Sequence, residues 1–93
     1  MTFITTLPFG DLLKQLRKHA GMTQGDLAAA LGYSLALISA LERNQRLPDL
    51  DAVIQRYIPA LTLQEEPHLA VQLVEAAANV RPPPGRSNVN GGW

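Results

Sequence analysis

The chain of 93 residues suits one small domain with a modest hydrophobic core. Its eight basic and eight acidic side chains cancel at neutral pH, whereas proteins that bind nucleic acids non-specifically are usually clearly basic. The absence of cysteine excludes disulfides and thiolate metal sites, and two histidines are too few for a convincing metal site. We therefore expect no metal and no other cofactor.

The sequence contains no segment expected to enter a membrane. Its start lacks the basic residues and the apolar run of a secretory signal. The most apolar region, residues 27–41, is interrupted by Gly32 and Ser34 and is too short to cross a bilayer. We expect a soluble, cytoplasmic protein. We do not expect an enzyme, because neither a Ser/His/Asp order nor a glycine-rich phosphate loop stands out.

The first predicted helix begins after Pro8, carries Asp11 in its first turn and stops at Gly21. Apolar residues recur along it at helical spacing, namely Phe9, Leu12, Leu13, Leu16 and Ala20. This spacing predicts a helix with one buried face.

Two shorter helices are predicted to follow. The second begins at a capping box formed by Thr23 and Asp26, whose side chains can satisfy free backbone N–H groups, and it ends at Gly32. Ser34 can cap the third helix, which runs to about Arg43.

A fourth helix is predicted after a loop over residues 44–48. Asp49 can cap it, and Pro59 is expected to close it because the residue before a proline disfavours the helical region. Four of its side chains are expected to point inward: Leu50, Val53, Ile54 and Tyr57.

A fifth helix is predicted from near Pro67 to about Val80. Its apolar stripe consists of Leu69, Leu73, Ala76 and Val80, widened by Val74 and Ala77. This stripe can cover the first and fourth helices of the same chain, which we favour. A homodimer remains the alternative, and it would set two DNA-reading helices about one DNA turn apart.

These elements predict an all-α fold, a compact bundle of about five short helices within one domain over residues 1–80. Residues 81–93 are rich in proline, glycine and asparagine and cannot bury enough apolar surface to fold alone. We expect them to form a flexible tail or linker.

The spacing around the second and third helices is the most informative feature of the sequence. Residues Leu27, Ala28, Ile38 and Leu41 fall where two helices that cross at a steep angle must pack. Ala28 is small enough for a close approach, and Gly32 can adopt the positive φ that a tight turn needs.

Over residues 9–61 the chain resembles the lambda-repressor-like (Cro/repressor, XRE-type) helix-turn-helix family. The matching residues run in order and without gaps: Leu16-Arg17, Gly21-Met22-Thr23-Gln24, Leu27-Ala28, Leu31-Gly32, Ile38-Ser39, Glu42, and Arg46 with Pro48. The resemblance implies a lambda-repressor-like domain that binds double-stranded DNA through the major groove, as part of a transcriptional regulator.

The resemblance also implies roles for individual residues. Arg17 and Glu42 would form a partly buried ion pair between the first and third helices. The residues implied to lie against DNA are Gln24, Ser34, Leu35, Ala36, Ser39, Ala40, Arg43, Asn44 and Arg46. The phosphate contacts would come from Gln24, Arg43, Asn44 and Arg46, with Lys14 and Lys18 as further candidates.

The positions implied to read bases are unusually apolar. Leu35, Ala36 and Ala40 can pack on a thymine methyl group, but they cannot make the bidentate contacts worth ~1–3 kcal/mol each in discrimination. Any sequence preference would be weak or would come from DNA shape. The alternative is a protein-interaction module on the same scaffold, such as the N-terminal domain of a larger signalling protein. Its partner would contact the apolar patch formed by Leu35, Ala36 and Ala40, with Leu37 nearby.

Overall fold

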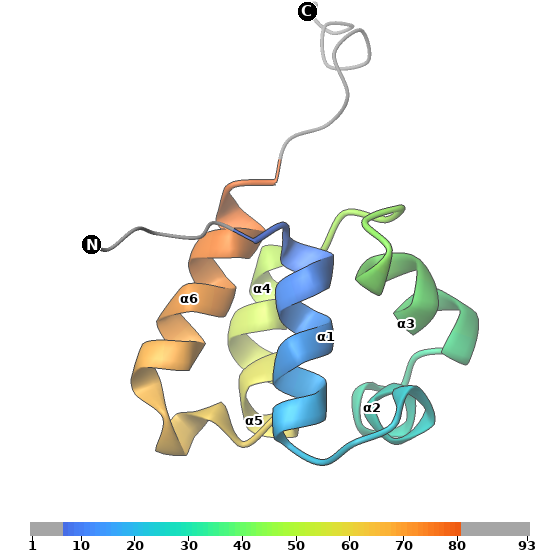
Figure 1. Ribbon diagram of the computed structural model, residues 1–93, viewed down its shortest axis with the longest axis horizontal. Helices are drawn as coiled ribbons and strands as arrows, with labels where there is room; N and C mark the ends of the chain where they lie inside the picture. The colour runs from blue at the N-terminus through green and yellow to red at the C-terminus, as the bar shows by residue number, and fades with distance from the viewer. Residues whose placement is uncertain (1–6, 81–93) are drawn as a thin grey trace, which may run out of the picture.

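The computed structural model describes residues 7–80, which form a bundle of helices without strands (Figure 1). The α-helices are α1 (Phe9–His19), α2 (Gln24–Leu31), α3 (Leu35–Glu42), α4 (Leu50–Ala52), α5 (Ile58–Ala60) and α6 (Pro67–Ala78). A π-helical segment, η1 (Val53–Tyr57), joins α4 to α5, and a 3-10 turn, η2 (Leu63–Glu65), precedes α6. The predicted all-α fold is confirmed. The tail predicted over residues 81–93 lies outside the described residues.

Helices α2, α3 and α4 begin at the caps predicted from the sequence. The Thr23 hydroxyl accepts a hydrogen bond from the Asp26 N–H at 3.0 Å, and the Asp26 carboxylate accepts one from the Thr23 N–H at 3.0 Å. The bond from the Thr23 backbone N–H, with a smaller contribution from the Thr23 side chain, holds the pKa of the Asp26 carboxyl below its usual value. The Ser34 hydroxyl accepts from the N–H three residues on at 3.1 Å, and Asp49 accepts from the N–H two residues on at 3.2 Å. Each cap satisfies a backbone donor that the helix itself leaves free.

The hydrophobic core lies between α1, the continuous rod formed by α4, η1 and α5, and the flanking helices (Figure 1). Its largest fully buried side chains are Leu13, Leu27, Leu31, Ile38, Val53, Tyr57, Leu61, Leu63 and Leu73. Helix α6 packs on α1 and α4 and buries Leu73 and Ala77. The expected intramolecular cover by the last helix is therefore confirmed.

The prediction for the inward face of the fourth helix is only partly right. Val53 and Tyr57 are buried, but Leu50 and Ile54 are 39% and 46% exposed. Ala52 is also buried, so the buried face consists of Ala52, Val53 and Tyr57. The buried stripe is thus rotated away from Leu50 and Ile54, which share an outward face at helical spacing.

The prediction that Pro59 closes the fourth helix is wrong. Ile58 keeps helical angles (φ −61°, ψ −49°), and its N–H bonds to the carbonyl of Val53, five residues back. The change from the π turn of η1 to the α turn of α5 falls next to Pro59, which has no N–H to donate to either helix. The helical rod continues to Ala60.

Gly10 allows the start of α1 to touch the end of α3. A β-carbon at Gly10 would lie 2.6 Å from the Glu42 carbonyl oxygen and 2.8 Å from Oδ1 of Asn44. The Gly10 N–H donates to that same Asn44 oxygen at 2.8 Å. Asn44 adopts a left-handed conformation with φ 61°, which ends α3 and turns its side chain towards α1. Only glycine fits this joint without displacing backbone atoms.

We predict that Gly10→Ala destabilises the domain by about 1–3 kcal/mol, because the added methyl group meets backbone carbonyls that cannot move aside easily. Gly25→Ala is the matched control. It lies in α2, where the nearest atom to an added β-carbon is Oγ1 of Thr23 at 3.7 Å, so it should stabilise the domain by up to about 1 kcal/mol. Urea unfolding midpoints measure both changes. Equal effects of the two substitutions would contradict the close approach of α1 to α3.

Candidate functional site

Helices α2 and α3 meet at a sharp corner. They are separated by three residues, and the chain direction changes by 112° between them. Gly32 ends α2 in the left-handed conformation (φ 73°, ψ 27°), as the turn requires. Ala28, Ile38 and Leu41 are buried where the two helices pack. The predicted steep crossing is confirmed.

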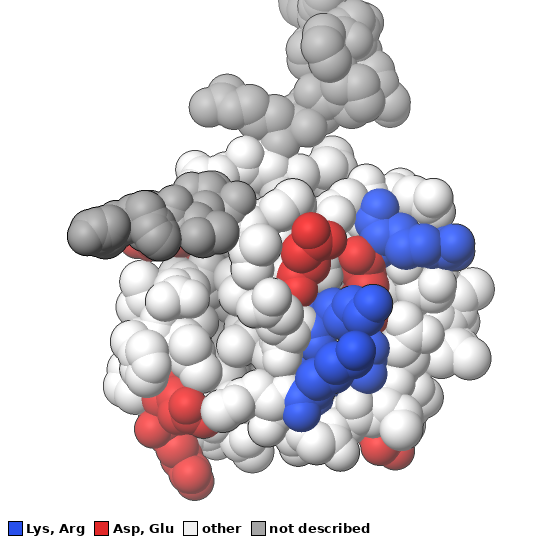
Figure 2. Space-filling view, in the orientation of Figure 1, with Lys and Arg blue, Asp and Glu red and all other residues white. Residues whose placement is uncertain are grey.

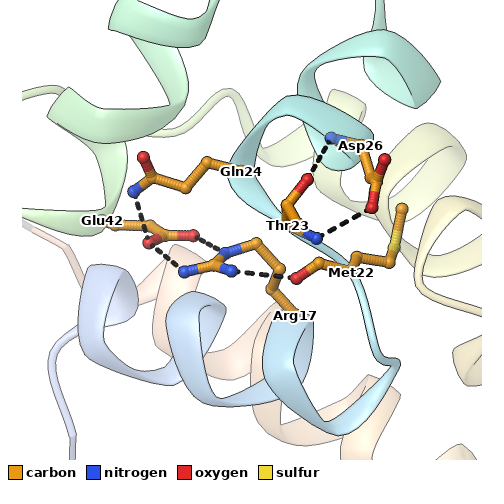
Figure 3. Close-up of polar contacts among 6 residues, drawn as sticks. All are labelled: Arg17, Met22, Thr23, Gln24, Asp26 and Glu42. Atoms are coloured by element: carbon orange, nitrogen blue, oxygen red, sulfur yellow. Dashed lines mark hydrogen bonds and ion pairs between the residues drawn. The ribbon is translucent and has the colours of Figure 1, made fainter.

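An ion pair connects the end of α3 to α1 (Figure 3). Nε of Arg17 donates to Oε2 of Glu42 at 2.6 Å, and Nη2 donates to Oε1 at 3.1 Å. The Arg17 and Glu42 side chains are only 9% and 2% exposed. Nη1 of Arg17 also donates to the backbone carbonyl of Met22 at 2.9 Å, so the same guanidinium fixes the turn before α2.

Gln24 adds α2 to this ion pair. Its Nε2 donates to Oε1 of Glu42 at 3.0 Å (Figure 3). Burial raises the pKa of the Glu42 carboxyl, but the hydrogen bonds from Arg17 and Gln24, with the charges of Arg17 and Lys14, outweigh it and leave the pKa lower than usual. Glu42 therefore stays ionised at neutral pH and holds α1, α2 and α3 at one point.

A second set of contacts holds the other side of the corner. Nη2 of Arg56, on η1, donates to the backbone carbonyl of Leu31, the last residue of α2. The Arg56 guanidinium carbon also lies 5.6 Å from the centre of the Tyr33 ring. The Tyr33 hydroxyl lies 3.5 Å from that of Tyr57, whose pKa is raised mainly by burial. These contacts join η1 to the turn between α2 and α3.

The side chains at the start of α3 face outward. Ser34, Leu35 and Ala36 are exposed, and Leu35 is 55% exposed. Further along the helix, Ser39 and Ala40 are half-buried. The corner thus presents the first turn of α3 to solvent and turns the rest of the helix partly inward.

The residues after α3 fall into two groups. Arg43 and Arg46 are exposed. Asn44 is exposed too, but its amide is engaged with α1: Oδ1 accepts from the Gly10 N–H, and Nδ2 donates to Oδ1 of Asp11 at 3.3 Å. The structure therefore gives Asn44 a role in holding the loop, which the sequence did not indicate.

Charge is distributed unevenly over the surface. In Figure 2, Lys and Arg side chains gather over α1 and, separately, beside the C-terminal end of α3, with Asp and Glu side chains between the two groups. Helix α3 itself carries one charged residue, the buried Glu42. The exposed face of α3 is therefore uncharged, with basic side chains only beyond its end.

A small hollow lies behind the end of α3. Its volume is about 110 Å³, and it is lined by Tyr33, Leu37, Leu41, Arg46, Leu47, Pro48, Asp49 and Tyr57. It opens between α3, the loop after it and η1. The sequence did not indicate it, because its walls are brought together only by the fold.

Comparison with known proteins gives one family. The family model of a helix-turn-helix domain matches residues 8–66, which is more than half of the chain and runs from α1 to the end of η2. Comparisons with curated proteins and with solved structures found no match. Among residues 7–80, no single helix is long and apolar enough to cross a membrane.

We predict that replacing either Arg17 or Glu42 alone destabilises the domain by about 3–5 kcal/mol, because the remaining charge is left buried and unpaired. The double variant Arg17→Met with Glu42→Leu should lose much less, since it removes both charges. Chemical denaturation of the two single variants and the double variant measures the coupling. Single variants that unfold at the same denaturant concentration as the parent would show that the Arg17–Glu42 ion pair does not hold α1 to α3.

Proposed function

The chain belongs to the helix-turn-helix domain family, and on this premise we propose that it is the DNA-binding domain of a cytoplasmic transcriptional regulator of the lambda-repressor-like, XRE type. The observation that supports this best is the corner itself. The ionised Glu42, held by Arg17 and Gln24, fixes α3 so that its first turn projects into solvent. A projecting, rigid helix end is what entry into a major groove requires.

In the proposed complex, the first turn of α3 meets the base edges. Leu35 and Ala36 contact thymine methyl groups, and Ser39 contributes one hydrogen bond. The Ser34 hydroxyl already accepts from a backbone N–H, so its own hydrogen is available to a base or a phosphate. Because these side chains carry little hydrogen-bonding capacity, sequence preference is weak or is read from groove shape.

Phosphate contacts supply most of the affinity in this proposal. Arg43 and Arg46 lie beyond the end of α3 and are exposed. Gln24, at the start of α2, is half-buried and reaches the same side of the corner as Glu42. Asn44 contributes indirectly, because its bonds to α1 hold the loop that carries the two arginines. Such contacts orient a domain on duplex DNA without selecting a sequence.

A protein-interaction module is the second candidate, and one observation favours it. The exposed side of α3 is apolar and uncharged, with Leu35 the most exposed large apolar residue on that helix. A patch formed by Leu35, Ala36 and Ala40 would suit an apolar partner surface. In this case the domain would be the N-terminal part of a larger signalling protein.

We predict that the domain binds duplex DNA with an affinity that falls as salt rises, with a slope of about −0.9 per neutralised phosphate. Arg43→Ala and Arg46→Ala should weaken binding equally for all sequences and lower the slope by about 1 each. Arg43→Lys and Arg46→Lys, which keep the charge, should retain most of the affinity. Selection from randomised duplexes at low and moderate salt, followed by fluorescence anisotropy, measures these effects. If no duplex is enriched and no duplex changes the anisotropy at any salt concentration, the DNA proposal is ruled out.

Leu35→Ala separates the two candidate functions. It removes only apolar contact, so DNA affinity should change by less than about threefold, consistent with a loss well under 1 kcal/mol. Binding to a protein partner through the same patch should fall about tenfold or more, because a buried leucine is worth about 1.5–3 kcal/mol. The comparison uses anisotropy with labelled DNA and pull-down from extract with the parent domain as reference. A large loss of DNA affinity would contradict this expectation and would mean that Leu35 contributes more to DNA binding than contact with a thymine methyl group explains.

A further inference from the structure

Helix α2 ends without a basic side chain of its own. The C-terminal end of a helix carries partial negative charge and carbonyl groups without helical partners, yet the last turn of α2 holds no Lys, Arg or His. The two residues after α2 donate their backbone N–H groups to the carbonyls of Ala28 and Ala29, at 2.9 Å and 3.3 Å. The carbonyl of Leu31 accepts instead from Nη2 of Arg56, on η1. Arg56 therefore caps α2 from a different element, with a cation at the negative end of the helix.

The same guanidinium lies against the turn between α2 and α3. A β-carbon at Gly32 would lie 3.5 Å from its Nη2, and its central carbon is 5.6 Å from the centre of the Tyr33 ring, within the range of a cation–π contact. Tyr57, the residue after Arg56, meets the same ring, with ring centres 6.1 Å apart and planes at 72°. Two consecutive residues of η1 therefore hold Tyr33, and the next residue, Ser34, is the cap at which α3 begins.

The first turn of α3 depends on this contact because the ion pair lies at the other end of the helix. Glu42 is the last residue of α3, and the first residue lies about 10 Å from it along the helix axis. The Tyr33 contact acts at the near end, directly before the cap. It has a fixed base, because Tyr57 is only 1% exposed and its ring packs against Phe9 of α1, with ring centres 6.2 Å apart. The two ends of α3 are thus held by separate sets of side chains.

We propose that Arg56 is a positioning residue for DNA binding, which holds the first turn of α3 at the angle needed to enter the major groove without itself contacting DNA. The inference rests on the proposed function and adds to it a residue outside the contact surface. Without the guanidinium, the carbonyl of Leu31 loses its donor and the Tyr33 ring loses one of its two neighbours on η1. The turn then samples further conformations, and the apparent affinity falls with the fraction of molecules that remains competent to bind.

Arg56→Met tests this role, because methionine keeps an unbranched side chain but removes the charge and the donors. The affinity for a duplex that the parent chain binds should fall about three- to tenfold, as expected for the loss of one partly exposed hydrogen bond. The salt dependence should keep the parent slope, because no phosphate contact is lost. Arg43→Ala, by contrast, should lower the slope by about 1. Fluorescence anisotropy with the same labelled duplex measures both.

Two further variants separate positioning from a general loss of stability. Arg56→Lys restores a cation and a donor, so it should recover most of the affinity. Ala77→Gly is the matched control, because Ala77 is buried on α6 and glycine in a helix interior destabilises the fold. Circular dichroism melts give a temperature at which every variant is folded, and there Ala77→Gly should bind DNA as the parent does. Equal losses in Ala77→Gly and Arg56→Met, or a slope in Arg56→Met that falls by about 1, overturn the proposal.

Amide hydrogen exchange of the full chain tests the same role without DNA. The backbone N–H groups of Gly32 and Tyr33 are bonded to the last turn of α2, and in Arg56→Met they should exchange faster by about the factor lost in affinity. The amides of α6 should keep their rates. Unchanged exchange at Gly32 and Tyr33 overturns the proposal. If the parent chain binds no duplex, the proposed function is rejected, and the exchange rates alone decide whether Arg56 holds the turn.

Discussion

The buried carboxylate of Glu42 is the constraint on which the helix-turn-helix geometry depends. An ionised group in a dry site costs several kcal/mol unless donors surround it. Here Arg17 supplies two donors from α1, and Gln24 supplies one from α2. A rotation of α2 or α3 would separate the Glu42 carboxylate from these donors. The pair therefore selects one arrangement of three helices, even if its net contribution to stability is small.

Two further joints limit the motion of α3 and α2. At the end of α3, Gly10 and Asn44 bring backbone atoms of α1 into contact with the last carbonyls of the helix. At the end of α2, Arg56 bonds to the carbonyl of Leu31 and covers Tyr33. Two of the joints hold the C-terminal end of α3, and the contacts of Gln24 and Arg56 hold the start and the end of α2. Together they fix the position of both helices relative to α1 and η1.

Local signals in the sequence predicted local structure well. The caps at Thr23, Ser34 and Asp49 involve residues two or three positions apart, and each was visible as a short pattern. The continuation through Pro59 was missed because a π turn leaves no simple mark in the sequence. The exposure of Leu50 was missed because apolar residues at helical spacing do not show which edge of the stripe faces the core. The candidate site likewise contains residues that the sequence indicated and residues that it did not. Arg17 and Glu42 were indicated only by a family resemblance, since 25 positions separate them, and the contacts of Arg56 and Asn44 with distant elements had no signal at all.

The bond from Gln24 to Glu42 has a consequence for how a bound anion would act on the domain. The amide nitrogen of Gln24 has two hydrogens, and the bond to Glu42 uses one of them. An anion that accepts the other hydrogen would share the same donor nitrogen and would lie close to the ionised carboxylate, so each of the two negative acceptors would weaken the bond to the other. Anion binding at the start of α2 and the bond that joins α2 to α3 would then be thermodynamically linked with opposite sign, each disfavouring the other. One neutral side chain would divide its two hydrogens between the fold and a ligand.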